Sequence, residues 1–263
     1  MSVPHSRPPA ELQTLVAPNA SPYTLDGTNS YLLGGPEVVV VDPGPDDAGH
    51  VSRILTHAAA RRGRVALILV THGHEDHQGA ARSLAEASGA PVGRWRGGDR
   101  PLDDGEVVGE SPVRLRVLHT PGHTPDHIAL LWEERRTLFS GDLVLGRGTV
   151  TVSPPEGSMD DYLRSLARVA SLDLAAIAPG HGPMIEDPAP RVAEYLAHRR
   201  LRERQVLEAV AAGPRTPGEI SALLYPDLDP RLHPAAEGTV LAHLLKLLGE
   251  GRVERAGNRY YTP

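Results

Sequence analysis

Short apolar runs recur through the first 180 residues, each long enough for a strand but too short for a helix. They lie at 38–41, 65–70, 128–132, 137–140 and 175–178. A strand-like segment lies at 12–17, and the segment at 113–118 alternates apolar residues with Arg114 and Arg116, as in a half-exposed strand. Apolar residues at helical spacing lie between them at 47–61, 78–87 and 159–170. This alternation predicts a layered α/β fold. Within 23–33, the dipeptide Asp26-Gly27 predicts a tight turn between two strands.

The pattern changes after Pro190, where a long helix rich in arginine and glutamate is predicted over 192–212. Thr216, followed by Pro217 and by Glu219 three residues on, has the spacing of a capping box and predicts another helix start. A third helix is predicted over 238–248, and a hairpin turns at 257–258. We therefore expect two domains, a catalytic domain over 1–190 and a winged-helix-like domain over 191–263.

Composition removes several classes of chemistry. The chain of 263 residues has no cysteine, so disulfides and thiolate metal ligands are excluded, and Lys246 is its only lysine. Arginine, glycine, proline or an acidic residue interrupts every apolar run, which predicts no membrane span and no membrane partner. The first twenty residues lack the apolar segment of a secretory signal. The expected location is cytoplasmic.

Basic residues concentrate in one part of the predicted long helix. Residues 191–263 carry 11 basic and 9 acidic side chains, whereas the whole chain has a net charge of −6. Arg199, Arg200, Arg202 and Arg204 form a basic tract. The tract could bind an anionic partner or could form a solvated helix face.

The candidate chemistry centres on the stretch from Thr71 to Gly79, which directly follows the apolar run at 65–70. It places four potential metal ligands within six positions, namely His72, His74, Asp76 and His77. Imidazole and carboxylate are the ligands of zinc-type sites. The pattern predicts a ligand cluster at the end of a strand.

Three further potential ligands also follow predicted strands, and these are His123, Asp142 and His181. Active sites in layered α/β folds collect at one edge of the sheets, so we expect all seven side chains to converge. Seven ligands suffice for two metal ions with an aspartate between them. Such a pair would activate a bridging hydroxide as the nucleophile.

The four motifs together resemble the metallo-β-lactamase-fold hydrolases: His-x-His-x-Asp-His at 72–77, Thr-Pro-Gly-His-Thr at 120–124, Ser-Gly-Asp at 140–142 and Pro-Gly-His-Gly at 179–182. The resemblance implies an αβ/βα four-layer sandwich. It also implies two ligand sets, with one metal held by His72, His74 and His123 and the other by Asp76, His77 and His181, and with Asp142 between them. Two Zn²⁺ ions are expected, although Mn²⁺ or Fe²⁺ can use the same ligands.

Other histidines near the motifs receive different interpretations. His127 is expected to orient a ligand or substrate by hydrogen bonding and, with Asp76, is a candidate catalytic residue. His119 is interpreted as a core residue or a neighbour of the ligands. His50 and His57 lie on a predicted helix and are expected at the surface.

Differences from known subfamilies narrow the reaction. The best-known lactamases have a cysteine where Asp142 stands, which argues against β-lactam hydrolysis. Oxygen-handling di-iron relatives have a glutamate in place of His74, which favours a hydrolytic zinc-type site. The segments 24–32, 139–146 and 198–205 resemble the β-lactamase-like protein 2 group. That group implies an endoribonuclease on single-stranded RNA or a hydrolase of small acyl thioesters.

The sequence ranks the endoribonuclease first, because a winged helix commonly binds nucleic acid, and a thioesterase of acyl-carrier or glyoxalase II type second. A non-catalytic nucleic-acid-binding protein is a third hypothesis, and the complete ligand set argues against it. The resemblance also suggests substrate contacts by Asn29, Tyr162 and His198. Apolar residues of the last predicted helix, such as Leu244, fit either a core or a homodimer interface.

Overall fold

The structure is a computed structural model that describes residues 11–213 and 215–263. Its first sheet has the order β1-β2-β3-β4-β5-β6, with β7 beside β5. The strands β3 and β4 run parallel at its centre and are buried, which explains why both are continuous apolar runs rather than alternating ones. The strands of this sheet are β1 (Leu12–Val16), β2 (Asn29–Leu33), β3 (Glu37–Val41), β4 (Arg64–Leu69), β5 (Val92–Trp95), β6 (Gly97–Gly98) and β7 (Arg100–Leu102).

The second sheet has the order β12-β11-β10-β9-β8. Its strands β11 and β12 are parallel, and the other neighbours are antiparallel. A parallel pair needs a long crossover, and the helix α4 (Met159–Ala170) provides it. The strands are β8 (Val107–Val108), β9 (Leu115–His119), β10 (Ile128–Trp132), β11 (Thr137–Gly141) and β12 (Ala176–Pro179).

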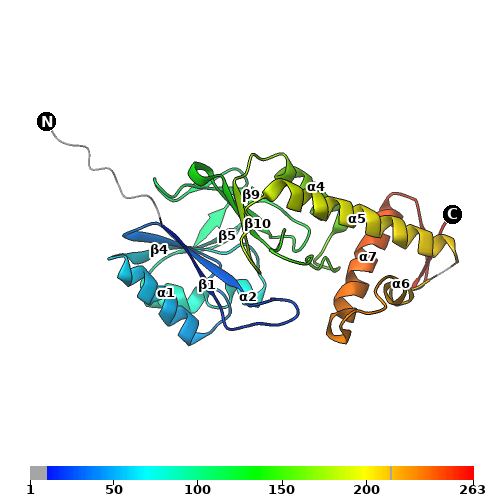
Figure 1. Ribbon diagram of the computed structural model, residues 1–263, viewed down its shortest axis with the longest axis horizontal. Helices are drawn as coiled ribbons and strands as arrows, with labels where there is room; N and C mark the ends of the chain where they lie inside the picture. The colour runs from blue at the N-terminus through cyan, green and yellow to red at the C-terminus, as the bar shows by residue number, and fades with distance from the viewer. Residues whose placement is uncertain (1–10, 214) are drawn as a thin grey trace.

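Helices cover the outer face of each sheet. The helices α1 (Ala48–Ala60) and α3 (Ala81–Ser88) pack on the first sheet in one apolar cluster. The helix α4 and the first part of α5 (Pro188–Ala211) pack on the second sheet in another. A third cluster fills the space between the two sheets. The predicted αβ/βα four-layer sandwich is therefore confirmed (Figure 1).

The last part of the chain forms the predicted winged-helix unit, which lies at the opposite end of the molecule from the first sheet (Figure 1). Thr216 Oγ1 accepts from the backbone N–H of Glu219, and the Glu219 carboxylate accepts from the Thr216 N–H, so the predicted capping box is present. The elements are α5, α6 (Pro217–Leu224), α7 (His233–Gly249), β13 (Glu254–Ala256) and β14 (Arg259–Tyr261), and the shorter helices are α2 (Glu75–Gln78), η1 (Glu133–Arg135) and η2 (Pro230–Leu232).

The helix α5 belongs to both parts of the molecule. Its residues Val192 and Tyr195 lie in the apolar cluster of the second sheet, whereas Val206 and Val210 lie in the core of the winged-helix unit. The predicted domain boundary at residue 190 falls within the first turn of this helix. The connection between the two units is thus a continuous helix rather than a loop.

One local prediction is wrong. The Asp26-Gly27 pair does not form a two-residue hairpin turn, because β1 ends at Val16 and pairs with β2 across a loop of residues 17–28. The Asn19 side chain closes this wide loop by hydrogen bonds to the backbone and hydroxyl of Thr28. The helix predicted over 78–87 is present as α3, and the shorter helix α2 precedes it.

Burial also changes two interpretations. His50, expected at the surface, is buried in α1, and its Nε2 lies 2.8 Å from Ser30 Oγ. In the basic tract, Arg199 is only 1% exposed, while Arg200 and Arg204 are exposed. The tract is therefore neither a continuous solvated face nor a continuous binding surface.

Within the described ranges, no helix combines the length and the apolar character needed to cross a bilayer. The expectation about a secretory signal concerns residues 1–20, of which 1–10 lie outside the described residues.

The packing of α5 against α7 gives a test of stability. Glu203 on α5 has a 16% exposed side chain and pairs with Lys246 at 2.9 Å and with Arg252 at 3.4 Å. Contact with the buried His243 and with Lys246 lowers the pKa of Glu203 to about 2, from an ordinary value of 4.5. The folded state therefore favours the carboxylate, and this stabilisation is complete above pH 4.5 and is lost as the pH falls toward 2.

We expect Glu203→Gln to lower the free energy of unfolding by roughly 1–2 kcal/mol at pH 7, a value reduced for the partial exposure of the pair. In denaturant titrations, the difference from the unsubstituted protein should shrink between pH 4.5 and pH 2. Glu208→Gln, at an exposed position of the same helix, is the matched control and should change stability by less than about 0.5 kcal/mol. A pH-independent effect of Glu203→Gln would contradict this account.

Candidate metal centre

The seven candidate ligands come from loops at the ends of strands in both sheets. His72 and His74 lie in the loop after β4, and His77 lies in the short helix α2 that follows it. His123 follows β9, and Asp142 and His181 come directly after the parallel strands β11 and β12. The structure brings all seven together at one edge of the sandwich, as the sequence predicts.

The first ligand set consists of His72, His74 and His123. One ring nitrogen from each lies within 4.8 Å of the others. His74 Nδ1 is 3.0 Å from His72 Nε2 and 3.0 Å from His123 Nε2. His72 is buried, whereas His74 is 39% exposed, so the set opens to solvent on the side of His74.

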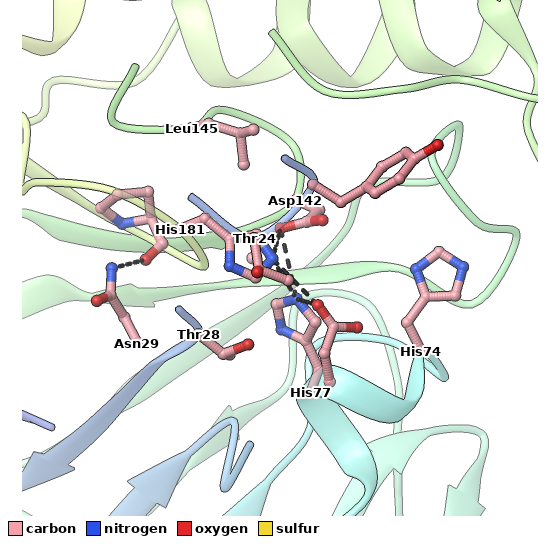
Figure 2. Close-up of polar contacts among 12 residues, drawn as sticks. Thr24, Thr28, Asn29, His74, His77, Asp142, Leu145 and His181 are labelled. Atoms are coloured by element: carbon pink, nitrogen blue, oxygen red, sulfur yellow. Dashed lines mark hydrogen bonds and ion pairs between the residues drawn. The ribbon is translucent and has the colours of Figure 1, made fainter. Parts of the chain in front are cut away.

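The second set consists of Asp76, His77 and His181 (Figure 2). His181 Nε2 is 3.3 Å from Asp76 Oδ2 and 3.3 Å from His77 Nε2. His77 Nε2 is also 3.7 Å from Asp76 Oδ2. Each of the two sets thus offers three ligand atoms around one centre.

Asp142 lies between the two sets. Its Oδ1 is 3.5 Å from both His77 Nε2 and His181 Nε2, while its Oδ2 is 3.6 Å from His123 Nε2. One carboxylate oxygen therefore faces each set. The Oδ1 atom is buried and has no hydrogen-bond partner in the structure.

Outer hydrogen bonds determine which nitrogen of each ring carries hydrogen. The Nδ1 atoms of His77, His123 and His181 lie 2.8 Å from Asp42 Oδ2, 2.7 Å from Thr151 O and 3.2 Å from Gly27 O. Carboxylate and carbonyl oxygens only accept, so Nδ1 is the donor in each case. The Nε2 atom of each ring keeps its lone pair, which points into the cluster.

The same logic holds for His72. Thr71 Oγ1 donates its hydrogen to Asp42 Oδ2 at 2.8 Å, so it can only accept from His72 Nδ1, which lies 3.1 Å away. Its Nε2 atom also presents a lone pair to the cluster.

These lone pairs test whether the residues fit metal ions. His77 Nε2 and His181 Nε2 face each other at 3.3 Å, and in the neutral rings neither has a hydrogen to donate. Two facing lone pairs repel each other unless a metal ion or a proton lies between or beside them. Together with the unpartnered oxygen of Asp142, they form a nitrogen and oxygen donor set of the kind that binds zinc-type ions. The residues fit two divalent cations.

Charge in the cluster agrees with this fit. Burial lowers the pKa of His72 well below its usual value, which keeps the ring neutral. Burial raises the pKa of Asp142, but the neighbouring His181 and His77 outweigh it and hold that pKa well below the usual range. Burial lowers the pKa of His77, but the neighbouring Asp42 and Asp142 outweigh it and hold that pKa well above the usual value, so the ring carries a proton when no metal ion is bound. The centre therefore favours positive charge beside its ionised carboxylates, which a metal ion can supply instead of the proton.

Asp42 is a functional residue that the sequence prediction missed. It follows β3, and its Oδ1 accepts from the backbone N–H of Thr71 at 2.8 Å, while its Oδ2 contacts Thr71 and His77. The sequence pattern of residues 42–45 predicts only the end of a strand and a breaker. The sequence did contain one feature that could have identified Asp42. It is an acidic residue at the end of β3, and β3 pairs with β4, the strand that precedes the histidine loop.

His127 is buried and contacts a ligand rather than the cavity. Its Nε2 accepts from the backbone N–H of Asp142 at 3.0 Å, and its Nδ1 lies 2.9 Å from Thr120 Oγ1. Burial lowers the pKa of His127 to about 3, so the ring is neutral and can accept this bond. The structure places His127 as a positioning residue for Asp142, and not as the catalytic residue that was a candidate.

None of the three suggested substrate residues is among the described residues that line the cavity next to the ligand sets. Asn29 Nδ2 donates to Pro179 O and Gly182 O, on either side of His181, so it braces that loop (Figure 2). Tyr162 is fully buried, and its hydroxyl donates to Leu143 O. His198 is half-buried on α5, where burial and Arg199 lower its pKa to about 4.

His119 stacks on Trp95, with ring centroids 3.8 Å apart, and belongs to neither ligand set.

A cavity of about 610 Å³ opens from the cluster toward the winged-helix unit. His74, Asp76, Asp142 and Leu145 are among the residues that line it. Figure 2 shows His74, Asp142 and Leu145. Tyr23 also lines the cavity, and its hydroxyl donates to Arg231 O at 2.8 Å, which joins the two units. The winged-helix unit contributes Tyr225, Leu228, Leu232, Ala235, Ala236 and Thr239 to the lining.

Comparison with known sequences and structures agrees with this geometry. The metallo-beta-lactamase superfamily matches residues 23–94 and 91–181, and the beta-lactamase associated winged helix domain matches residues 216–260. A Beta-lactamase-like protein 2 homolog from Caenorhabditis elegans is 34% identical over 250 residues, which cover 90% of this chain and 83% of that protein.

Two further relatives extend the comparison. An atrochrysone carboxyl ACP thioesterase from Aspergillus fumigatus is 34% identical over 200 residues, covering 73% of this chain and 62% of that protein. The crystal structure of a metallo-beta-lactamase family protein from Thermus thermophilus superposes with a TM-score of 0.82 at 29% identity, covering 96% of this chain and 98% of that chain. The chain therefore belongs to the metallo-beta-lactamase superfamily of metal-dependent hydrolases and carries the winged helix domain associated with it.

Proposed function

We propose that the protein is a dinuclear metal-dependent hydrolase of acyl thioesters, with two Zn²⁺ as the expected ions. The apolar wall of the cavity next to the ligand cluster carries this proposal. Both units contribute apolar residues to the lining, namely Tyr23, Leu25, Leu145 and Val150 from the catalytic part and Leu228 and Leu232 from the winged-helix unit. An apolar acyl chain can bury its surface there while its carbonyl group lies at the metal centre.

The charges around the cavity also favour a neutral substrate. Arg147 and Arg199 are the cations among the described lining residues. Arg147 pairs with Asp26 at 2.9 Å, and the buried Arg199 donates to Val150 O. Phosphate recognition uses arginines that are free to form paired hydrogen bonds, and both of these are already engaged.

The reaction would add water to the carbonyl carbon of the thioester, break the C–S bond and release a carboxylic acid and a thiol. Bound divalent ions would supply Lewis acidity and lower the pKa of the attacking water. Asp76 lines the cavity, and although burial raises its pKa, contact with His181 keeps that pKa below the usual value. Its ionised carboxylate is placed to accept a hydrogen bond from the water. Asp142, held by His127, fixes the distance between the two ligand sets.

A relative named as an acyl-carrier thioesterase supports the same choice. Cleavage of single-stranded RNA, ranked first from the sequence, moves to second place because the basic tract on α5 is interrupted by the burial of Arg199. The exposed Arg200 and Arg204 keep RNA as the competing substrate. A purely nucleic-acid-binding role would leave the assembled ligand cluster without a use.

The first prediction from the proposed function concerns metal content. We expect metal-quantified protein to hold two Zn²⁺ per chain and His181→Gln to hold one, because His181 belongs to one ligand set only. Removing the ions with a chelator should abolish turnover and lower the melting temperature, since the facing lone pairs then lose their cations. His119→Gln is the control and should retain both ions. Two ions remaining in His181→Gln would contradict the assignment of the sets.

The second prediction concerns the substrate. Purified Zn²⁺-loaded protein is offered an aliphatic acyl-pantetheine thioester and single-stranded RNA in parallel, with Asp76→Ala as the variant. We expect turnover of the thioester, and a decrease in kcat/KM of about 10²-fold or more in the variant, because Asp76 contributes to both the metal site and water activation. RNA cleavage that depends on Asp76, with the thioester left intact, would replace the proposal by the endoribonuclease.

A further inference from the structure

The loop of residues 149–157 connects the metal centre to the winged-helix unit. Thr151 O in this loop lies 2.7 Å from His123 Nδ1 and accepts its hydrogen. This bond sets the orientation of the ring and leaves His123 Nε2 facing His74 Nδ1 at 3.0 Å. The position of the Thr151 carbonyl therefore decides where one nitrogen of the first ligand set lies.

The helix α7 packs against this loop at Gly238. A Cβ atom added at Gly238 would lie 2.1 Å from Ser153 Oγ and 2.8 Å from Ser153 Cβ, distances that real Cβ atoms essentially never have. Glycine inside a helix costs about 1 kcal/mol relative to alanine. Its presence in the middle of α7 allows the helix to approach the loop closely.

The helix α5 holds the other side of the same loop. Arg199 is 1% exposed, donates to Val150 O and places its guanidinium over the ring of Tyr162, 5.1 Å from the centroid. Val150 and Val152 are buried in the apolar cluster that also contains Ala242 of α7. Thr151 thus lies between two residues that α5 and α7 hold in place.

We propose that the winged-helix unit is a positioning element of the metal centre. The helices α5 and α7 clamp the loop of residues 149–157, and the Thr151 carbonyl transmits this constraint to His123. Affinity for the ion held by His72, His74 and His123 then depends on a helix contact at Gly238. The positioning of His123 does not depend on which ester is hydrolysed, so it can be tested separately from the proposed thioesterase activity.

The test uses full-length Gly238→Ala. The added methyl group must displace Ser153, so we expect the affinity for one of the two Zn²⁺ ions to fall about 10-fold, at the low end of the effect of losing an outer contact of a ligand. Affinities are measured by competition with a chromophoric chelator. The hydrogen-bonded Nδ1–H proton of His123, identified in NMR spectra by its absence in His123→Gln, should change its chemical shift.

Three further variants separate positioning from a general effect on folding. Gly249→Ala makes the same change at the end of α7, where a Cβ would meet nothing within 4 Å, and it should leave both affinities and the His123 signal unchanged. Ser153→Gly removes both atoms that would lie closer than 3.0 Å to the new methyl group and leaves Ser153 Cα at an ordinary contact distance of 3.5 Å, so it should restore affinity and signal in the Gly238→Ala background. Ser153→Gly alone completes the double-mutant cycle.

Thermal unfolding of each variant completes the test. Higher helix propensity should keep Gly238→Ala folded at the assay temperature, so its loss of affinity is measured on folded protein. Unchanged metal affinity and an unchanged His123 signal in Gly238→Ala would overturn the proposal. A loss of affinity that Ser153→Gly fails to restore would overturn it equally.

Discussion

The structure depends on a set of imidazole lone pairs that face one another across a few ångströms. His77 Nε2 and His181 Nε2 are 3.3 Å apart, and outer hydrogen bonds place the hydrogen of each neutral ring on Nδ1. The folded chain therefore holds the neutral rings in a repulsive arrangement that a metal ion or a proton relieves. Asp42, the Gly27 carbonyl and the Thr151 carbonyl each hold one ring in this arrangement, and they come from three separate segments of the chain. Much of the sandwich fixes the positions of these three segments relative to one another.

The four-layer fold makes this convergence possible. The strands β3 and β4 of one sheet and β11 and β12 of the other are parallel pairs, and each pair directs its carboxyl ends to one edge. Asp42, the loop that begins at Thr71, Asp142 and His181 follow these four strand ends. Helix crossovers cover the outer faces and seal the apolar core, so polar groups can gather only where the strands stop. The position of the metal centre therefore follows from the direction of the two parallel strand pairs.

Much of this could be predicted from the sequence, because strand runs followed by histidine and aspartate are local patterns. The convergence of the ligands and the capping box at Thr216 are of this kind, whereas the arrangement in four layers was implied by the resemblance to a known family. Burial of His50 and Arg199 could not be predicted, since helical spacing shows which residues share a face but not which element covers that face. Asp42 was missed for a related reason: its partners, Thr71 and His77, lie about thirty residues away and are neighbours only across the β3–β4 pair.

The role of the winged-helix unit follows from α5. Because this helix lies in the apolar clusters of both units, the winged helix cannot swing away as a separate body without pulling Arg199 from its buried contact with Val150. The cavity between the two units is therefore formed before any substrate binds. When a cavity is preformed, little of the binding free energy is lost in ordering its walls. A preformed cavity therefore suits an apolar acyl chain, which forms few directional contacts. It also means that residues far from the cluster, on α7, can affect the geometry of the ligands through the loop that they cover.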